Sequence, residues 1–566
     1  MKLVCLLWGG GIGVGAAIAA GVGWSCEAMA QPIPPQSPQL PSLPDRLPPP
    51  SPDILVPPLE MSPERDGPAE EIPEIWVREI EVLGNTVFSE AQLAELTAAY
   101  EGRSLVFEEL INLRTAITDL YVANGYTTSG AFIPPQDVSD GVVQVQVVEG
   151  RLDRLTITGV RRLSEGWIRR RLERASDSPL SLPALEQALQ LLQQDPAIAS
   201  VRAELMAGRG PGLSELQLTV TEAFPVEGRL QLANRNSPNV GSLRPSVEME
   251  VYSPLGIGDS LLGEFGITEG VREGFVRYEL PVNAENTRLS LSYQRGRSRV
   301  VEEPFEVLEI RSTDEDWRLG VSHPLWETSN DVFRVGMSLG LQRSRTFLFD
   351  DEPFSFSDGP EDGRSNLTVL QLTQDWSSRS PAEVVAARSQ FSLGVDAFNA
   401  TRNETGPDGL FFAWLGQFQW VRSLAPDTLL VTRMAAQLAA DPLLPISQFG
   451  LGGPDTVRGY LQNQRVGDSG VMLSLEFRYP LIRDPGGLGL VQIAPFFDVG
   501  TVWNLGSDRE IPNPQTLLGT GVGLRWEMSP DFSATVDWGI PLVDVGDRGE
   551  SLQGNGVYFS IEYRPF

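Results

Sequence analysis

Short segments that alternate apolar and polar residues fill the chain from Val226 to its end, and this pattern constrains the fold more than any other feature of the sequence. In FAWLGQFQW (412–420), aromatic residues at alternating positions from Phe412 to Trp420 share one face, whereas Gln417 and Gln419 share the other. Alternation of this kind fits a half-buried strand in water as well as a strand in a membrane. The same pattern recurs, between turn residues, at 288–296, 390–398, 472–480, 521–528, 532–539 and 557–564.

The number of these segments favours strands in a membrane over half-buried strands in water. Residues 226–566, at roughly 20 residues for a strand with its connection, hold about sixteen strands. Outward faces rich in aromatic residues are typical of strands in lipid, and the mean hydropathy of −0.11 is no objection because alternate residues would face a polar lumen. We therefore expect residues 226–566 to form an all-β transmembrane barrel of about 16 antiparallel strands.

Ahead of this region the chain is mixed α and β, and it repeats with a period of about 75 residues. IEVLGNTVFSEAQLAEL (80–96) predicts a strand, a turn and a helix capped by Ser89. LTITGVRRLSEGWIRRRL (155–172) predicts the same elements with Ser164 as the cap, and both copies end in strands of period two. We expect two α+β domains, at 76–150 and 151–225, each built as strand, helix, helix, strand, strand.

The N-terminal residues predict export. Lys2 precedes an apolar run that ends in Ala28-Met29-Ala30, a site of small residues that a signal peptidase could cut, so we expect a signal peptide at 1–30. An uncleaved membrane anchor is the alternative. Residues 31–75 are dense in proline, which favours extended polyproline II, and we interpret them as a linker.

Several chemistries lack the residues they need. His323 is the only histidine, and both cysteines, Cys5 and Cys26, precede the predicted cleavage site, so zinc sites, Ser-His-Asp triads and thiol catalysis are not expected. We expect no cofactor, no metal and no enzymatic activity. A net charge of −30 also argues against a nucleic-acid partner. The basic run around Arg169–Arg171 does not change this, because Trp167 and Leu172 belong to an apolar face opposite to it.

Three motifs carry a resemblance to a known family. EVLGNTVFS followed by GYTTSGAFIPPQDVSDGVVQVQVVEGRL resembles the first of the paired POTRA domains of two-partner secretion transporters, the hemolysin secretion/activation family. QFGLGGPDTVRGYLQNQRVGDSG (448–470) resembles the loop motif of that family, and FFDVGTVW (496–503) resembles its aspartate-bearing strand motif. The family's members often carry an N-terminal helix that plugs the barrel, but proline-rich sequence occupies that region here.

The resemblance implies a protein-translocating pore in the bacterial outer membrane, with the POTRA-like domains in the periplasm. The implied partners are a large secreted client protein that passes unfolded, the lipid of the outer membrane, and the barrel assembly machinery during biogenesis. An outer-membrane barrel assembly factor, or insertase, shares this architecture and stays open as an alternative. A diffusion porin and a periplasmic enzyme or binding protein are more distant alternatives.

Two candidate sites follow from these motifs. In the loop motif (Gly452, Gly453, Val457, Gly459 and Tyr460), Arg458 would enter a partly desolvated lumen, where a carboxylate is its natural partner. Asp498 is the best candidate because Phe497 and Val499 share the opposite face of its strand, and the resemblance implies the same loop-to-wall pair. The glycines would let the loop approach the wall closely.

The second candidate site is a client-docking segment in the first POTRA-like domain. We expect an extended client to add as a strand near Phe132, Ile133, Pro134, Gln136 and Asp137 and the strand that follows them. The acidic run 349–363 is expected in a loop outside the cell, because its carboxylates would repel one another in a narrow lumen.

Overall fold

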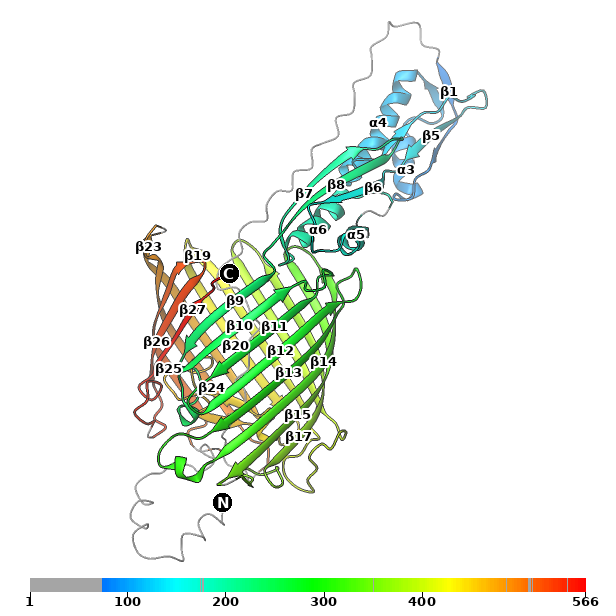
Figure 1. Ribbon diagram of the computed structural model, residues 1–566. Coiled ribbons are helices and arrows are strands. Elements are labelled where there is room, and N and C mark those ends of the chain that lie inside the picture. Colours follow the sequence, from blue (N-terminus) through cyan, green and yellow to red (C-terminus); the bar gives the residue numbers. More distant parts are fainter. Residues whose placement is uncertain are drawn as a thin grey trace, which may run out of the picture. The chain divides into compact units, whose positions relative to one another are not determined.

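The computed structural model describes residues 74–566 except 174, 176, 177, 350, 485, 507–510, 512 and 547. The predicted signal peptide, the region of an N-terminal plug and all but the end of the predicted linker lie outside these residues. The described chain forms two compact units (Figure 1), one made of the residues up to Pro225 together with Leu255–Gly258 and the other of Val226–Pro254 and Asp259–Phe566.

The first α+β repeat folds around helix α4, which lies on a three-stranded sheet of order β2-β5-β4. β2 is parallel to β5 and β4 is antiparallel to it. Ile117 and Tyr121 of the helix pack against Val143 and Val145 of the central strand. The elements are β1 (Ile75–Val77), β2 (Glu79–Leu83), α3 (Glu90–Thr97), β3 (Arg103–Leu105), α4 (Phe107–Ala123), β4 (Gly130–Phe132) and β5 (Val142–Val148), with β1 and β3 forming a separate ribbon.

Apart from the β1–β3 ribbon, which it lacks, the second repeat has the same order of elements and an equivalent sheet, β6-β8-β7. Trp167, Ile168 and Leu172 are buried on one face of α5, as predicted for the basic run. In the first repeat the predicted cap is also present, since Ser89 and Gln92 form a capping box at α3. The elements are β6 (Arg151–Thr158), α5 (Glu165–Glu173), α6 (Leu182–Gln193), β7 (Ile198–Ala207) and β8 (Leu213–Glu222).

A carboxylate fixes the turn that precedes α5. Oε1 of Glu222 accepts hydrogen bonds from the backbone N–H groups of Arg161, Arg162 and Leu163 at 2.7–2.9 Å. Desolvation would raise the pKa of Glu222, but these three donors stabilise the ionised form and hold its pKa below the usual value.

The second unit is a closed antiparallel barrel of sixteen spanning strands, which confirms the predicted fold class. A further two-residue strand, β16 (Glu352–Pro353), pairs only with the end of β15. The spanning strands are β9 (Val226–Ala233), β10 (Arg244–Tyr252), β11 (Ser260–Ile267), β12 (Val271–Pro281), β13 (Arg288–Arg299), β14 (Arg311–Glu327), β15 (Asp331–Leu348), β17 (Arg364–Arg379), β18 (Glu383–Gly394), β19 (Phe412–Ala425), β20 (Thr428–Ala439), β23 (Ser469–Asp484), β24 (Gly489–Trp503), β25 (Thr516–Ser529), β26 (Phe532–Pro541) and β27 (Val557–Tyr563).

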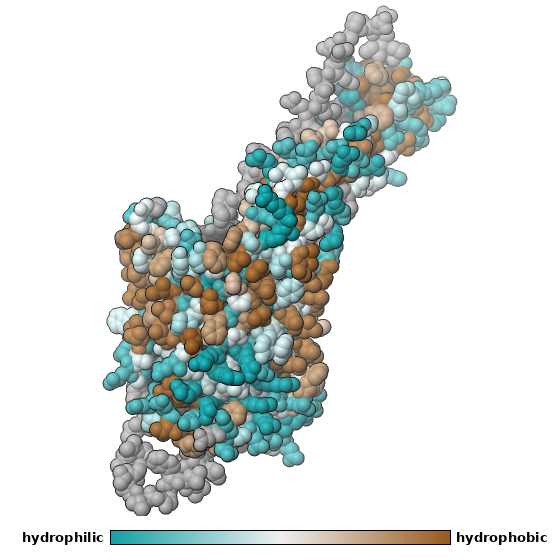
Figure 2. Space-filling model, in the orientation of Figure 1, coloured by the Kyte–Doolittle hydropathy of each residue, from teal (hydrophilic) through white to brown (hydrophobic). Residues whose placement is uncertain are grey.

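The alternation of each strand divides it between lipid and lumen. In β19, Phe412 is exposed on the outer surface, whereas Gln417 and Gln419 are buried inside the barrel. Figure 2 shows the resulting apolar band on the visible wall, with hydrophilic residues toward the end of the barrel that carries the long loops. One expected segment was too long: β18 ends at Gly394, and the chain turns at Phe398 and Asn399, which have positive φ angles of 52° and 64°.

Loops of very different length lie at the two ends of the barrel. Because β9 enters from the α+β repeats, the loops that follow β9 and every second strand after it lie at the far, extracellular end. The described part of the acidic run 349–363 lies there, between β15 and β17, while Asp350 falls outside the described residues. Among their described residues, the extracellular loops contain three short 3-10 helices: η3 (Pro238–Val240), η4 (Phe305–Leu308) and η5 (Pro445–Ser447).

The barrel closes through a short seam between its first and last strands. β27 registers with β9 only from Ser560 to Tyr563, opposite Leu230–Ala233, whereas β9 registers with β10 along its whole length. Beyond Tyr563, the backbone C=O of Phe566 accepts a hydrogen bond from Gly228 N at 3.0 Å.

Candidate functional site

The loop between β20 and β23, residues 440–468, folds back into the barrel, and we call it the hairpin loop. Its two arms pair as β21 (Phe449–Leu451) and β22 (Arg465–Gly467). The tip carries Val457 and Tyr460, which are completely buried in a cluster with Leu517 and Val502 of the barrel wall. An apolar anchor on either side of residue 458 therefore holds the loop against the inner wall.

Arg458, at the tip, binds Asp498 of β24 with a two-pronged fork. Its Nε donates to Oδ2 at 2.8 Å and its Nη2 donates to Oδ1 at 2.9 Å, while the backbone N–H of Arg458 donates to Oδ2 at 3.1 Å. Arg458 is 2% exposed and Asp498 is 0% exposed. The guanidinium also lies over the ring of Phe496, 3.4 Å from its centroid. The structure thus brings together the two residues that the sequence proposed as a pair.

The pair belongs to a larger set of buried charges, the ionic network of Arg458, Arg478, Arg525, Glu476, Asp498 and Asp537. Glu476 of β23 accepts from Arg458 Nη1 at 2.7 Å, from Arg525 Nη2 at 2.7 Å and from Arg478 Nε at 2.8 Å. Arg525 of β25 also donates to Asp537 of β26 at 2.8 Å. Three guanidiniums thus face three carboxylates, so each buried charge has a partner of opposite sign.

The sequence analysis missed Glu476, Arg525 and Asp537, although a signal was present. Each of them alternates with apolar neighbours within its strand, as Glu476 does between Leu475 and Phe477, which are exposed on the outer surface. A charged residue at the inward position of an amphipathic strand must find a partner in the lumen. That rule would have identified the three residues as lumen groups without identifying their partners.

Glycines of the wall, more than glycines of the loop, allow the close approach. A Cβ on Gly519 of β25 or on Gly539 of β26 would collide with the backbone of Arg458. In the loop, Gly459 (φ +101°) lies against the backbone of Ile540 and Pro541. Gly452 and Gly453 instead face the returning arm of the hairpin at Leu461 and Gln462, which corrects the expectation that they approach the wall.

Two tyrosines fix the tip between the last strands. The hydroxyl of Tyr460 donates to Leu518 O at 2.7 Å and accepts from Val543 N at 3.1 Å. From β27, the hydroxyl of Tyr558 accepts from Gly459 N at 2.9 Å and donates to Tyr460 O at 2.6 Å. Arg548 adds a bond to Gly459 O at 2.8 Å. The loop motif is therefore bonded to β25 and β27 in addition to the ionic network.

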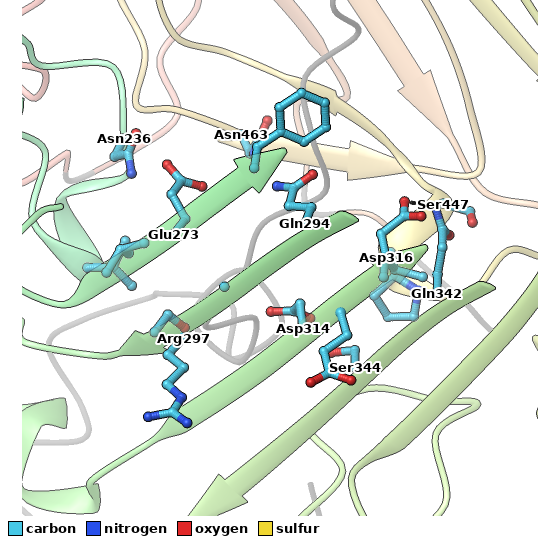
Figure 3. A pocket seen from close by; sticks show the side chains of 18 of the residues that line it. Asn236, Glu273, Gln294, Arg297, Asp314, Asp316, Gln342, Ser344, Ser447 and Asn463 are labelled. Carbon is cyan, nitrogen blue, oxygen red and sulfur yellow. Dashed lines mark hydrogen bonds between the residues drawn. The ribbon is translucent and has the colours of Figure 1, made fainter. Parts of the chain in front are cut away.

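Space remains in the lumen beside the hairpin loop. A cavity of ≈ 910 Å³ lies between the loop and the wall formed by β10–β15. In Figure 3, Glu273, Gln294 and Asp316 project from the wall into this space, with Ser447 and Asn463 of the hairpin loop on its other side. The lining is polar and carries both signs of charge, as expected for a water-filled passage that the loop narrows.

The predicted docking segment lies at the end of β4 and in the connection that follows it. Phe132 ends β4 and is 44% exposed, but the neighbouring edge groups are already bonded within the domain. Ala131 N donates to Thr118 Oγ1 at 3.1 Å. The side-chain amide of Gln136 accepts from Gln144 N at 2.7 Å and donates to Gln144 O at 2.8 Å, as a neighbouring strand would.

Three further observations limit the chemistry of the described residues. No helix among them combines the length and apolar content needed to cross a bilayer. In the same part of the chain, no three His, Cys, Asp or Glu side chains gather as metal ligands would. His323 lies within β14, with Nδ1 2.8 Å from Thr287 Oγ1.

The fold and the site define a class of protein: an outer-membrane barrel with periplasmic POTRA domains and a hairpin loop held in its lumen. The family model described as "Haemolysin secretion/activation protein ShlB/FhaC/HecB" matches residues 212–526, and the model "POTRA domain, ShlB-type" matches residues 75–150. The chain belongs to this haemolysin secretion/activation family. It is an outer-membrane pore of two-partner secretion, through which a partner protein is exported.

Individual relatives agree with this assignment. The chain is 26% identical over 506 residues to "Outer membrane transporter CdiB" of Escherichia coli O6:K15:H31 (strain 536 / UPEC), covering 87% of this chain and 82% of that protein. It is 19% identical to "Heme/hemopexin transporter protein HuxB" of Haemophilus influenzae (strain 86-028NP), covering 82% of each chain. These relatives are transporters.

Solved structures show the same fold. CdiB from Escherichia coli superimposes with a TM-score of 0.67 at 24% identity, covering 90% of this chain and 94% of that one. BamA from Haemophilus ducreyi lacking POTRA domains 1–3 gives a TM-score of 0.53 at 15% identity, covering 86% and 99%. The likeness to BamA concerns the fold alone.

Proposed function

We propose that the chain exports one large secreted protein that passes the lumen as an unfolded chain, and that it performs no catalytic step of its own. The observation that carries this proposal is the hairpin loop, which fills part of the lumen and is held there only by non-covalent contacts, the apolar anchor of Val457 and Tyr460 and the bonds of Arg458. An unfolded polypeptide would pass the cavity beside the loop only after the loop is displaced, so the closed barrel with Arg458 in place is the resting state.

We further propose that the client first binds the periplasmic unit by strand addition, mainly at β7. Gly208 N donates to Leu213 O at 2.8 Å and continues the β7–β8 ladder, so every second residue back along β7 bonds to β8. The N–H and C=O groups of Val201, Ala203 and Leu205 then point away from β8. They have no hydrogen-bond partner among the described residues, and β7 contains no proline or lysine to block an added strand.

The segment 132–137 is a second proposed docking surface. Here a client strand would have to displace the amide of Gln136 from Gln144, and the connection contains two prolines that offer no N–H. β7 is therefore the stronger proposal because its edge is longer and a client strand would have no hydrogen bond to displace there. The main-chain mode of binding at either edge makes little demand on client sequence.

Export of a secreted client, to be identified by sequencing the adjacent reading frames, tests the proposal. Deleting residues 76–223 should leave a heat-modifiable barrel in the outer membrane and abolish export, because barrel strands close on each other without the periplasmic unit. Ala203→Pro should reduce export by removing an outward N–H from the β7 edge, whereas Ala203→Ser keeps that donor and serves as the matched control. Export that persists after the deletion would contradict docking on the periplasmic unit.

An insertase is the second candidate function, favoured only by the fold shared with BamA. It makes a different prediction, because loss of the chain would lower the amounts of unrelated outer-membrane barrels. Measuring those barrels in a deletion strain separates the two functions. Unchanged barrel levels together with a retained intracellular client would support the exporter.

A further inference from the structure

The seam between β9 and β27 is fastened at its extracellular end by side-chain amides where the backbone register stops. In a regular ladder Phe559 N would donate to the backbone C=O of Asn234. Here it donates instead to Oδ1 of the Asn234 side chain at 2.7 Å, while Nδ2 of the same side chain donates to Val557 O at 2.9 Å. Asn234 N keeps its ladder bond to Phe559 O at 3.2 Å. One asparagine, 1% exposed, thus extends the seam along β27.

The backbone carbonyl that this arrangement releases is bound by a second buried amide. Gln553, in the loop between β26 and β27, is 0% exposed. Its Nε2 donates to Asn234 O at 2.6 Å and to Asn236 O at 2.7 Å. Its Oε1 accepts from Gln462 N, in the hairpin loop, at 3.1 Å. Gln553 therefore joins the end of β9 directly to the hairpin loop.

Contacts from both seam strands, on either side of Gln553, also reach the hairpin loop. Arg235, next to Asn234, pairs with Asp455 of the hairpin loop at 3.0 Å. On the β27 side, Tyr558 bonds to the backbone of Gly459 and Tyr460. Each seam strand thus holds the hairpin loop, and the loop in turn supplies the donor that satisfies Oε1 of Gln553. A buried acceptor that loses its donor is costly, so the loop and the amide stabilise each other.

We propose that Asn234 and Gln553 form an amide latch that couples closure of the barrel seam to the position of the hairpin loop. When the loop leaves the wall, Gln553 loses Gln462 N and becomes accessible to water, and its bonds to Asn234 and Asn236 weaken. The extracellular half of the seam is then held by the short backbone register alone. Conversely, a closed seam presents Gln553 in the geometry that receives the loop, since coupling between two sites is reciprocal.

Two variants with a single engineered cysteine measure the opening of the seam and the release of the hairpin loop. Cys5 and Cys26 are the only cysteines of the chain, and replacing both with alanine leaves an engineered thiol as the sole target. Ala233→Cys places a thiol in the seam, where residue 233 is 3% exposed and opposite Ser560. Val457→Cys places one at the buried tip of the hairpin loop. The rate of maleimide labelling of the purified full-length protein measures how often each site opens.

Arg458→Ala should raise labelling of both engineered thiols, because it unseats the loop. In a Gln553→Ala background, which loses three hydrogen bonds, labelling of the seam thiol at position 233 should already be raised at least about 2- to 10-fold, the value of the bond to Asn234 O alone, and Arg458→Ala should add little more. Gln448→Ala is the matched control: this buried amide binds Asp468 at 3.0 Å beside the base of the hairpin and has no bond to either seam strand. It should leave labelling of the seam thiol unchanged.

The decisive quantity is the increment that Arg458→Ala adds to the labelling rate of the seam thiol at position 233. If the loop merely covered residue 233, that increment would be the same with and without Gln553, and the latch would be refuted. Unchanged labelling of the seam thiol in Arg458→Ala would refute it as well. Heat-modifiable migration shows that each variant is folded, and Asn234→Asp, which replaces the donor to Val557 O with a carboxylate oxygen that repels this carbonyl, should reproduce the seam effect if Gln553→Ala does not fold. Client export is not measured, so the outcome is independent of the proposed client.

Discussion

Removal of Arg458 should release the hairpin loop more strongly than removal of its partner Asp498. In Arg458→Ala, the fully buried Asp498 retains only the backbone N–H of residue 458 as a donor among the described residues, so one carboxylate is stranded. In Asp498→Ala, the guanidinium keeps Glu476 at 2.7 Å and Asp537 at 3.4 Å. The asymmetry follows from the other carboxylates of the ionic network.

The magnitudes can be worked from these contacts. Stranding a buried charge costs about 3–5 kcal/mol, which at about 1.4 kcal/mol per factor of ten corresponds to roughly 100- to 4,000-fold more frequent opening. Losing charge-assisted hydrogen bonds while other partners remain costs about 1.5–3 kcal/mol, or roughly 10- to 150-fold. The Ala/Ala double mutant removes both charges, so its effect should be smaller than the sum of the two single effects.

Maleimide labelling of Val457→Cys measures the opening, and planar-bilayer recordings should show altered conductance in the same variants. Arg483→Ala is the matched control, because Arg483 pairs with Asp427 at 2.9 Å with both side chains about half exposed. Exposed pairs contribute at most about 1 kcal/mol, so labelling should not change. The reasoning is refuted if Asp498→Ala opens the loop more than Arg458→Ala, or if the two defects simply add.

Three other predictions concern different parts of the chain. Gly539→Val should expel the hairpin loop and raise single-channel conductance, because its side chain would occupy the space of Gly459, whereas Gly263→Val, whose Cβ would meet no atom within 4 Å, should leave conductance unchanged. Glu222→Gln should speed hydrogen–deuterium exchange at residues 161–163 at pH 7. Because the pKa of Glu222 is lowered, the stability that its carboxylate gives to this turn is fully present above the usual pKa of 4.5 and is lost as the pH falls through the folded pKa. Equal exchange of mutant and wild type at pH 7 would contradict this role. Protease added to intact cells should cut within 349–363, and complete protection of an assembled barrel would count against the extracellular placement of this loop.

Alternation and repetition were sufficient to predict the fold. A period of two recurring along residues 226–566 determines which side chains face lipid, and closure follows because a membrane strand cannot leave its edge unpaired. The repeat of cap, helix and paired strands likewise predicted both α+β domains. The end of β18 was missed because alternation continues through Val395 and Ala397, while the turn at Phe398 and Asn399, which have positive φ angles, leaves no mark in the pattern.

The site was only partly accessible from the sequence. The alternation of apolar and polar residues predicted that Asp498 faces the lumen, and the loop glycines indicated a close approach of the loop to the wall. Neither pattern says which wall residues face Arg458. That depends on the stagger of neighbouring strands, which places Gly519 opposite Asp498 and Asp537 opposite Gly523. The roles of Gly519 and Gly539 could likewise not be predicted from the sequence, because a glycine within a strand matters for packing only where another backbone segment passes close to it.

The ionic network also has a consequence for biogenesis. Apart from Arg458, its members come from four consecutive strands: Glu476 and Arg478 on β23, Asp498 on β24, Arg525 on β25 and Asp537 on β26. A slip of one residue in any of these strands would turn its charged group from the lumen to the lipid face, where an arginine costs about 2–4 kcal/mol near the bilayer midplane and an aspartate or glutamate costs less. Arg458 can therefore bind only a correctly registered wall. A barrel with one misaligned strand would therefore leave Arg458 without part of its partners and the loop less firmly seated.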